Sequence, residues 1–331
     1  MPHLLEVQDL TTVFAGDYGT NISVDHVSFH VDRGEVVCLV GESGCGKSVT
    51  SLSIMGLLGR GGAVTDGSVL FENKNLLAMT EKELDEIRGD ELTMIFQDPL
   101  TSLNPVFTVG SQITESIRVH MHLSKEEARE RAAKLLGRVG MPDAQGVMKK
   151  FPHTLSGGMR QRVMIAMALA CNPKLLIADE PTTALDVTIQ AQIMKLLGEL
   201  RREKNMAMIL ITHDIGLVAN MADRVIVMYA GQIVEEAPVQ ELFGNPRHPY
   251  TKALLDTVPT IRDDESRQLM AIPGMVPENY DDITGCRFAD RCPYRQKECD
   301  SPQELYCFGE GQAARCIVAF QKEEQAGKRH F

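Results

Sequence analysis

The pattern of hydrophobic and polar positions changes period along the chain, and each change predicts a different element. From Leu4 to Val31 apolar and polar residues tend to alternate, which is typical of antiparallel strands with one solvated face. From Val36 to Val40 the chain is continuously apolar, and glycines and a predicted helix from Lys47 to Leu58 follow. This order predicts a buried strand that leads through a glycine-rich turn into a helix.

The middle of the chain is predicted to hold helices and then parallel strands. Residues from about Val109 to Val139 have helical character, and Ser124 and Glu127 have the spacing of a capping box. Further on, two apolar runs, Leu175–Ala178 and Met206–Ile211, flank a segment with apolar residues at helical spacing, namely Ile189, Ile193, Leu196, Leu197 and Leu200. A strand–helix–strand order predicts a parallel sheet.

The C-terminal part of the chain differs in amino-acid composition. Beyond Gly244 proline-rich connections lead to a cluster of cysteines, which indicates a separate module. We therefore expect one domain over residues 1–243, with a helical part at about 100–172, and a C-terminal extension over 244–331. The mostly polar residues from Phe320 to Phe331 are expected to be frayed.

Composition narrows the possible classes of protein. The 331 residues include 34 Lys and Arg against 45 Asp and Glu, a net charge of −11, which argues against a nucleic-acid surface. The N-terminal segment lacks the features of a secretory signal, and no apolar run approaches the roughly 20 residues of a membrane helix. We expect a chain that stays in the cytosol and does not span a bilayer.

The turn after the first buried strand matches the phosphate-binding loop pattern. Glycines let successive backbone N–H groups at a helix N-terminus face phosphate oxygens. Lys47 is expected to neutralise the β and γ phosphates of ATP, and the Ser48 hydroxyl to bind Mg²⁺. The residues expected to hold the nucleotide here are Gly41, Glu42, Ser43, Gly44, Cys45, Gly46, Lys47, Ser48 and Val49.

Two adjacent carboxylates end the next buried strand. A strand at Leu175–Ala178 would deliver Asp179 and Glu180 to the edge of the sheet. Asp179 is expected to hold Mg²⁺ through a water, and Glu180 to orient and deprotonate the attacking water, a role worth roughly 10²- to 10⁴-fold in rate. Alternatively the pair simply begins a solvated loop.

A Ser-Gly-Gly turn supplies a second helix N-terminus. Ser156, Gly157 and Gly158 precede a predicted helix from Arg160 to Ala170. Alone such a turn usually means a flexible connection. Its order and distance from the loop and the carboxylates, however, make the chain resemble the nucleotide-binding domain of ABC ATPases. The resemblance implies an α/β P-loop NTPase fold with an antiparallel β subdomain, a helical subdomain and, here, a C-terminal Cys-rich extension.

The resemblance implies roles for further residues. Gln97 matches the glutamine loop, which contacts Mg²⁺ or the lytic water and links to the transmembrane partner. Asp186 matches the loop that crosses the dimer interface, and His213 matches the switch histidine at the γ phosphate. Phe14 is expected to stack on adenine, with Tyr18 as the alternative.

In this family two nucleotides are sandwiched between two motor subunits. The resemblance implies that Ser156, Gly157 and Gly158 serve the partner's ATP. The residues that serve the ATP bound by this chain are Lys47, Asp179, Glu180 and His213. It also implies two transmembrane permease subunits, an extracytoplasmic substrate-binding protein and a second, related motor chain. We expect the chain at the cytoplasmic face of the membrane and expect no nucleic-acid partner.

Two C-terminal segments resemble those of the oligopeptide, dipeptide and nickel importer ATPases. They are Asn245–Leu255 and Ile272–Pro277, and they have no catalytic logic visible in the sequence. The resemblance implies peptide import, with nickel or another small solute as the alternative cargo. A soluble ABC ATPase and a regulatory nucleotide binder are the other possibilities. The first is disfavoured because the chain has neither long coiled coils nor a second motor domain.

Five of the eight cysteines lie close together near the C-terminus. The gaps between Cys286, Cys292, Cys299, Cys307 and Cys316 are five, six, seven and eight residues, which is no CxxC zinc ribbon. In some peptide-importer ATPases four cysteines here hold a 4Fe-4S cluster, and the matching positions are Cys286, Cys292, Cys299 and Cys316. Cys307 could replace a neighbour, and Zn²⁺ or unligated thiols remain alternatives.

Overall fold

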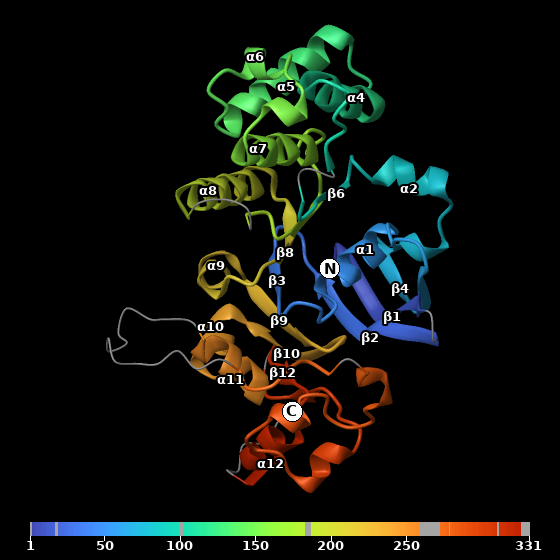
Figure 1. The fold of residues 1–331 in the computed structure, drawn as a ribbon, viewed down its shortest axis with the longest axis vertical. Coiled ribbons are helices and arrows are strands. Elements are labelled where there is room, and N and C mark those ends of the chain that lie inside the picture. The colour runs from blue at the N-terminus through green and yellow to red at the C-terminus, as the bar shows by residue number, and fades with distance from the viewer. Residues whose placement is uncertain are drawn as a thin grey trace. The chain divides into compact units, whose positions relative to one another are not determined.

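The computed structural model describes residues 2–16, 19–98, 102–182, 187–257, 272–277, 279–309 and 311–325. The chain forms two compact units. The first comprises Met1–Leu4, Val31–Glu35 and Ala78–Ile211, and the second comprises Leu5–His30, Val36–Leu77 and Thr212–Phe331. Figure 1 traces the chain from blue at the N-terminus to red at the C-terminus.

The first unit combines a small parallel sheet with helices. Its strands β6 (Leu92–Ile95), β7 (Leu175–Asp179) and β8 (Ala207–Ile211) pair in parallel in the order β8-β7-β6, which confirms the predicted parallel arrangement. All residues of these strands are buried, as their continuous apolar sequences require. Its helices are α2 (Glu81–Ile87), α4 (Val109–Met121), α5 (Lys125–Arg138), α6 (Ala144–Val147), η2 (Pro152–Thr154), α7 (Gly157–Ala168) and α8 (Val187–Lys204).

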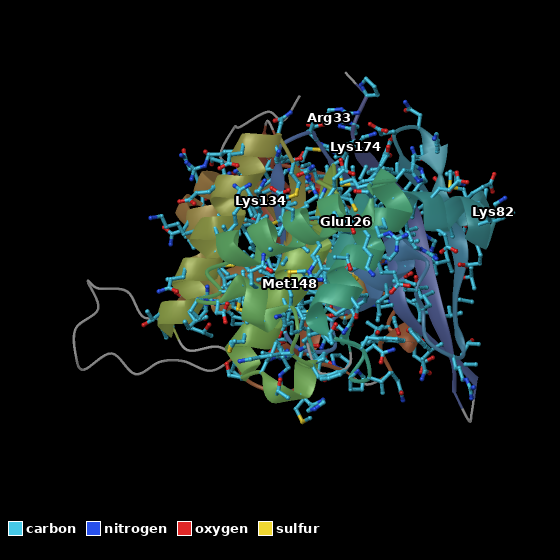
Figure 2. All side chains as sticks on the ribbon, turned by 90° about the horizontal axis from the view of Figure 1, so that it is seen from above. Arg33, Lys82, Glu126, Lys134, Met148 and Lys174 are labelled. Carbon is cyan, nitrogen blue, oxygen red and sulfur yellow. The ribbon has the colours of Figure 1, made fainter. Side chains whose placement is uncertain are left out.

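Helix α5 shows how the spacing of apolar residues and a capping box produce a helix in the predicted helical segment. Ala128, Ala132 and Leu136 of α5 recur every four residues and are fully buried, while Glu126 and Lys134 lie exposed (Figure 2). The predicted capping box is confirmed, since the Ser124 amide donates to Glu127 Oε2 at 2.9 Å and the Glu127 amide donates to Ser124 Oγ at 3.3 Å.

The second unit contains two sheets. Strands β1 (Leu5–Gly16), β2 (Gly19–Val31), β4 (Gly62–Phe71) and β5 (Lys74–Asn75) form a four-stranded sheet in the order β2-β1-β4-β5, in which β1 pairs antiparallel with β4. In the other sheet β3 (Val36–Val40) pairs in parallel with β9 (Arg224–Tyr229), and β9 pairs antiparallel with β10 (Gln232–Pro238). The helical elements are α1 (Lys47–Met55), η1 (Leu76–Ala78), α9 (Ile215–Met221), α10 (Val239–Gly244), α11 (Pro249–Asp256), η3 (Tyr280–Asp282), η4 (Ala289–Arg291), η5 (Lys297–Asp300) and α12 (Ile317–Gln325).

The C-terminal segment extends this second sheet. The short strands β11 (Tyr306–Cys307) and β12 (Ala313–Ala314) pair with each other, and β12 pairs antiparallel with β10. The boundary expected at 243/244 therefore falls inside the second compact unit. Among the described residues no helix is both long and apolar enough to cross a membrane.

Two sequence expectations about element ends are corrected. Helix α1 ends at Met55 rather than Leu58, because Gly56 adopts a left-handed conformation (φ 62°) and closes the helix. Residues from Phe320 to Gln325 are helical rather than frayed, while the rest of the expected tail lies outside the described residues. The Phe320 ring stacks on Tyr306 with 4.7 Å between centroids. This aromatic contact is long-range and leaves no periodic signal in the sequence.

Candidate nucleotide-binding site

The turn between β3 and α1 has the backbone that a phosphate-binding loop needs. Gly41 has a φ of 152°, and a Cβ there would lie 2.2 Å from the Met228 carbonyl oxygen. Gly46, the N-cap of α1, has a φ of 103°, and a Cβ there would lie 2.6 Å from the Ser23 carbonyl oxygen. Both positions combine a left-handed backbone with a close backbone neighbour, so only glycine fits.

The Lys47 side chain folds back and contacts the backbone of this loop. Its ammonium donates to the carbonyl oxygens of Gly41 and Glu42 at 2.9 Å each, and the residue is only 6% exposed. A compact positive charge is thus held at the N-terminus of α1, where the free amides of the helix also attract anions. Burial raises the pKa of the neighbouring Cys45, which keeps that thiol protonated near neutral pH.

The two predicted carboxylates lie at the end of β7 in the first unit. Asp179 is buried at the end of the strand, and the next residue, Glu180, has a φ of 46°, an unusual conformation for a residue with a side chain. The Glu180 amide donates to the Ile211 carbonyl oxygen at 3.0 Å. Strain of this kind gathers at functional sites, because the surrounding structure must hold it in place.

Gln97 and Glu180, which are far apart in sequence, are in direct contact. Gln97 Nε2 donates to Glu180 Oε2 at 3.1 Å. The structure thus brings together the predicted glutamine-loop residue and the predicted general base within the first unit. An amide beside the carboxylate can hold that carboxylate or a water in a fixed orientation.

The Ser-Gly-Gly turn opens helix α7. Ser156 is the N-cap, and its Oγ accepts a hydrogen bond from the Met159 amide at 3.4 Å. Gly157 is exposed, and a Cβ there would meet no atom within 4 Å. Gln161, a buried residue of α7 that sequence reasoning missed, donates through Nε2 to the Pro181 carbonyl oxygen and ties α7 to the segment after Glu180.

The remaining predicted nucleotide contacts have defined positions. His213 follows β8 and is exposed, immediately before Asp214, the N-cap of α9. Phe14 on β1 is half-buried, and its ring lies against Gly62 of β4. Tyr18 and Asp186 lie outside the described residues. The phosphate-binding loop, Phe14 and His213 belong to the second unit, whereas the carboxylates and the Ser-Gly-Gly turn belong to the first.

Four of the five C-terminal cysteines share one environment. In each of them the sulfur accepts a hydrogen bond from a backbone N–H. The Cys286 sulfur accepts from Phe288 and the Cys292 sulfur from Tyr294. The Cys299 sulfur accepts from Gln296, and the Cys316 sulfur from Val318 and Ala319. Burial and repulsion from the other three thiols raise the pKa of Cys286 to about 12. Cys307 is exposed on β11.

The spacing of these sulfurs bears on the metal that they fit. Within the described part of the chain, no three cysteine sulfurs are close enough to share one metal ion. Four thiolates on one zinc ion would each lie at about 2.3 Å from it and would therefore crowd together. Among the described residues these cysteines therefore form no ready-made site for a single metal ion.

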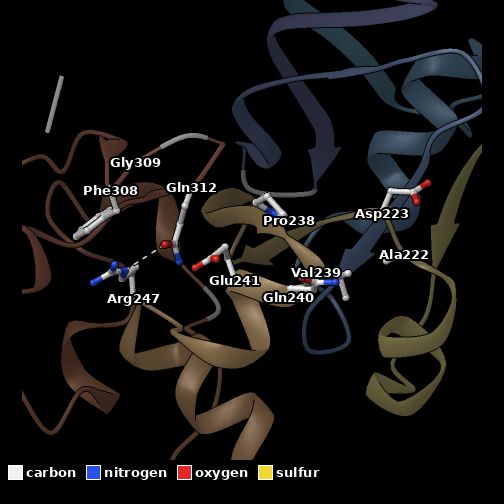
Figure 3. A pocket seen from close by; sticks show the side chains of 10 residues that line it. All are labelled: Ala222, Asp223, Pro238, Val239, Gln240, Glu241, Arg247, Phe308, Gly309 and Gln312. Atoms are coloured by element: carbon white, nitrogen blue, oxygen red, sulfur yellow. Dashed lines mark hydrogen bonds between the residues drawn. The ribbon is translucent and has the colours of Figure 1, made fainter.

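A polar hollow lies elsewhere on the second unit. It has a volume of about 730 Å³, and its lining includes the start of α10, Arg247, Phe308, Gly309 and Gln312 (Figure 3). Arg247 Nε donates to Gln312 Oε1 at 3.2 Å across this hollow, and the guanidinium lies 5.0 Å from the Phe308 ring centroid. These residues belong to the C-terminal half of the unit rather than to the phosphate-binding loop.

Comparison with known proteins places the chain in a family. The ABC transporter family profile matches residues 24–183, and the profile of the oligopeptide/dipeptide transporter C-terminal region matches residues 234–299. The chain is 54% identical over 320 residues to the oligopeptide transport ATP-binding protein AppD of Bacillus subtilis, covering 96% of this chain and 97% of that one. It is 51% identical to the dipeptide transport ATP-binding protein DppD of Escherichia coli, covering 95% and 96%.

Solved structures agree with the fold. The dimeric ATP-binding cassette MJ0796 in a post-hydrolysis state with ADP and Pi superposes with a TM-score of 0.65 at 30% identity, covering 71% of this chain and 98% of that one. The cbiO1 protein of Clostridium perfringens, part of an ABC transporter complex, gives a TM-score of 0.61 at 32% identity, covering 74% and 92%. These matches and the loop geometry confirm the expected P-loop α/β fold. The chain belongs to the ABC transporter family as an ATPase subunit that carries the oligopeptide/dipeptide transporter C-terminal region.

Proposed function

We propose that this chain hydrolyses ATP to energise the import of dipeptides or oligopeptides across the cytoplasmic membrane. The observation that carries the proposal is similarity over 96% of the chain to a relative named for oligopeptide transport, including the C-terminal region at residues 234–299. The chain would work at the cytoplasmic face, with residues 1–243 as the ATP-binding domain and 244–331 as its extension. Its partners are a second, related motor chain, two permease subunits and an extracytoplasmic binding protein.

The phosphate-binding loop supports the proposed mode of ATP binding. The free amides at the start of α1 and the Lys47 ammonium present converging positive charge to the β and γ phosphates. The Ser48 hydroxyl, Asp179 and Gln97 supply hard oxygen ligands for Mg²⁺, directly or through water. Phe14 stacks on adenine in this proposal, and His213 contacts the γ phosphate.

Glu180 is the proposed general base. Its carboxylate accepts a hydrogen bond from Gln97 Nε2 at 3.1 Å, and in this proposal it orients and deprotonates the attacking water. The left-handed backbone at Glu180 turns the chain sharply after β7 and fixes where the side chain leaves the strand.

The Ser-Gly-Gly turn is proposed to act on the nucleotide of the partner motor. Ser156 and Gly157 are exposed at the N-terminus of α7, and the space beside Gly157 is open. An exposed helix N-terminus with free amides suits an approaching phosphate, and the missing side chain permits close approach. Asp186 is proposed to lie at the same dimer interface.

The substitution Glu180→Gln in the assembled transporter tests the proposed activity. ATP turnover is expected to fall roughly 10²- to 10⁴-fold while ATP binding is retained, because only proton abstraction is lost. Glu91→Gln is a matched control, since Glu91 forms a partly exposed ion pair with Lys174 in the same unit, at 2.9 Å. Turnover of Glu180→Gln equal to that of the control would remove Glu180 as the base.

The cargo is tested with the same assembly. Adding the binding protein loaded with di- or oligopeptides is expected to stimulate ATP turnover, whereas adding Ni²⁺ is not. Stimulation by Ni²⁺ alone would assign the chain to the nickel branch of the family instead.

We further propose that Cys286, Cys292, Cys299 and Cys316 hold a 4Fe-4S cluster, with Cys307 outside the ligand set. The all-thiolate donor set and the backbone N–H groups that donate to the sulfurs of Cys292 and Cys299 support a cluster in which each thiolate binds an iron. The group would stabilise the extension without a part in hydrolysis.

Metal analysis of the full-length chain tests the cluster. An anaerobic preparation is expected to contain iron and sulfide and to absorb broadly in the visible range. Cys299→Ser should lower both contents, whereas the matched Cys307→Ser variant should keep them. Stoichiometric zinc without iron would overturn the cluster, and loss of iron in Cys307→Ser would change the ligand set.

A further inference from the structure

Glu42, in the phosphate-binding loop, is paired with an arginine from the cysteine segment. Arg291 Nη1 lies 2.7 Å from Glu42 Oε2, and Nη2 donates to Glu42 Oε1 at 3.0 Å. The Arg291 side chain is only 6% exposed and that of Glu42 29%, so this two-bonded pair is shielded from solvent. It differs from an ordinary surface ion pair, which contributes little.

Arg291 has little freedom to move. Its guanidinium lies 5.7 Å from the ring centroids of both Tyr229 and Phe288 and donates to the Tyr229 hydroxyl at 3.2 Å. Its Nε donates to the Pro273 carbonyl oxygen at 2.8 Å. Stacking and hydrogen bonds together fix the plane of the guanidinium that faces Glu42.

The backbone of Glu42 is held from the same side. Its amide donates to the Tyr250 hydroxyl at 2.8 Å, and Tyr250 is fully buried. The Tyr250 ring packs against Tyr229 and Phe288, with centroids 4.7 and 5.4 Å apart. The two C-terminal segments without a role visible in the sequence thus contribute Tyr250 and Pro273 to one group of contacts around Glu42 and Arg291.

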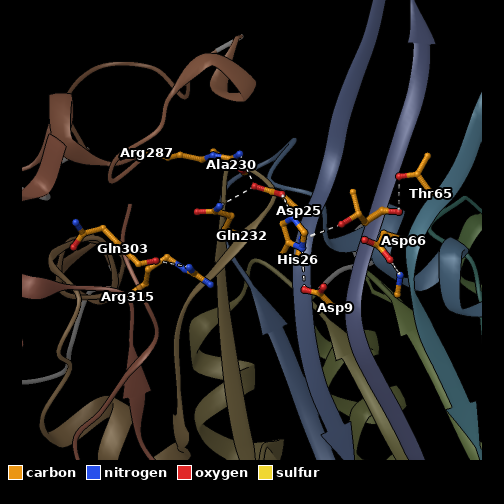
Figure 4. Close-up of polar contacts among 12 residues, drawn as sticks. Asp9, Asp25, His26, Thr65, Asp66, Ala230, Gln232, Arg287, Gln303 and Arg315 are labelled. Carbon is orange, nitrogen blue, oxygen red and sulfur yellow. Dashed lines mark hydrogen bonds and ion pairs between the residues drawn. The ribbon is translucent and has the colours of Figure 1, made fainter. Parts of the chain in front are cut away.

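The position of Arg291 depends on the folded cysteine segment. Arg291 ends η4, between Cys286 and Cys292, and the Cys286 amide donates to the Cys299 carbonyl oxygen at 2.8 Å. Next to Cys286, Arg287 Nη2 lies 2.6 Å from Asp25 Oδ2 of β2, and Gln232 Nε2 donates to the same oxygen at 2.8 Å (Figure 4). The chain just before the short helix that carries Arg291 is therefore anchored both to the rest of the cysteine segment and to β2.

Two physical consequences follow for a bound polyphosphate. Arg291 neutralises a carboxylate that would otherwise repel phosphate groups in the same loop. It also fixes the residue whose carbonyl oxygen accepts from the Lys47 ammonium at 2.9 Å, so the loop is preorganised before the nucleotide arrives.

We propose that Arg291 is a positioning residue for ATP binding, through which the folded cysteine segment sets the nucleotide affinity of the phosphate-binding loop. The inference rests on the proposed ATP-binding role of that loop. Arg291 touches neither phosphate nor the lytic water in this proposal, so it acts on affinity rather than on the chemical step.

The test measures the Kd of ATP with the full-length chain, and KM and kcat in the assembled transporter. Arg291→Gln is expected to raise the Kd and KM for ATP about tenfold and to leave kcat nearly unchanged. Arg295→Gln is the matched control, because Arg295 pairs with Asp290 and Asp300 in the same segment, half-exposed and without contact to Glu42. The control is expected to change the Kd less than about twofold.

A double-mutant cycle separates this role from a general loss of fold. In the Arg291→Gln background, Glu42→Gln removes the uncompensated carboxylate and is expected to recover part of the lost affinity. Metal content and thermal unfolding of each variant are measured alongside. An unchanged Kd in Arg291→Gln, an equal loss in Arg295→Gln, or strictly additive effects would each overturn the inference.

The outcome is distinct from that of the proposed function. If peptide fails to stimulate turnover of the unaltered complex, peptide import is wrong, whatever Arg291 does. If turnover responds to peptide but the Kd is insensitive to Arg291, only the positioning role is wrong.

Discussion

Glycine residues serve two different purposes in the candidate nucleotide site. At Gly41 the backbone is left-handed, and a Cβ would lie 2.2 Å from the Met228 carbonyl oxygen, so the chain's own packing requires glycine. At Gly157 a Cβ would meet nothing within 4 Å, so packing within this chain does not require glycine. Since the fold of this chain does not require a glycine at this position, contact with a partner is the reason that we infer for it.

The substitution Gly157→Ala should therefore separate stability from activity. The free energy of unfolding of the isolated chain is expected to stay level or rise by up to about 1 kcal/mol, because alanine loses less backbone entropy in a helix. Transport-coupled ATP turnover is expected to fall about a hundredfold, since a methyl group displaces the partner's nucleotide from α7.

Gly137→Ala is the matched control, because a Cβ at Gly137 in α5 also meets nothing within 4 Å. Urea unfolding and ATP turnover of both variants check the prediction. If Gly157→Ala retains full turnover, the turn does not approach the partner's ATP.

The residues differ in how far the sequence could predict them. Lys47 and Glu180 lie in short motifs whose order carries the chemistry. Arg291, Tyr250 and Gln161 act through contacts with residues distant in sequence, and an isolated arginine or tyrosine has no local pattern. Such positioning residues emerge only when the fold brings the segments together.

Helix α11 depends on a buried histidine at its N-terminus. His248 Nδ1 accepts from the Tyr250 amide at 3.0 Å, and its own amide donates to Glu235 Oε2 at 2.8 Å. Burial, with Arg315 and Lys252 adding repulsion, lowers the pKa of His248 to about 3. The neutral imidazole is thus the cap that begins α11 and places Tyr250.

This cap predicts a loss of stability in acid. Because the folded pKa of about 3 lies below the ordinary value of 6.5, the unfolded chain binds the proton between these values. Stability from this group is complete above pH 6.5 and falls as the pH drops toward 3, by about 2 kcal/mol at pH 5. His248→Asn retains a capping oxygen without a titrating group, so its stability should fall less between pH 7 and pH 5. Urea unfolding at both pH values measures the difference, and parallel curves for the two proteins would contradict it.

At the scale of elements, periodicity predicted the buried strands well and their ends less well. The continuous apolar runs became β3, β7 and β8, because residues buried on both faces of a sheet must all be apolar. Helix α1 stopped early at Gly56, and α12 extended into a polar tail that Tyr306 covers. The left-handed conformation of Gly56 sets the end of α1, and contact with the distant Tyr306 ring favours the helical conformation of α12.

For the whole molecule, the predicted roles divide between the nucleotide held by this chain and the nucleotide held by its partner. Lys47 belongs to the first group and Ser156 to the second. A subunit that works this way should show the effects of its two groups of residues on different chains.

Photolabelling of the assembled transporter with an azido-ATP analogue, followed by separation of the two motor subunits, tests that division. Lys47→Ala is expected to lower labelling of this chain about tenfold or more, because it removes the charge that faces the phosphates. Ser156→Ala is expected to lower labelling of the partner motor and to leave that of this chain close to the unaltered level. Ser124→Ala, which removes the N-cap of α5 but lies in no predicted nucleotide contact, controls for loss of a helix cap in the same unit. If Lys47→Ala and Ser156→Ala both reduce labelling of this chain alone, each motor closes its own site, and the head-to-tail arrangement is wrong.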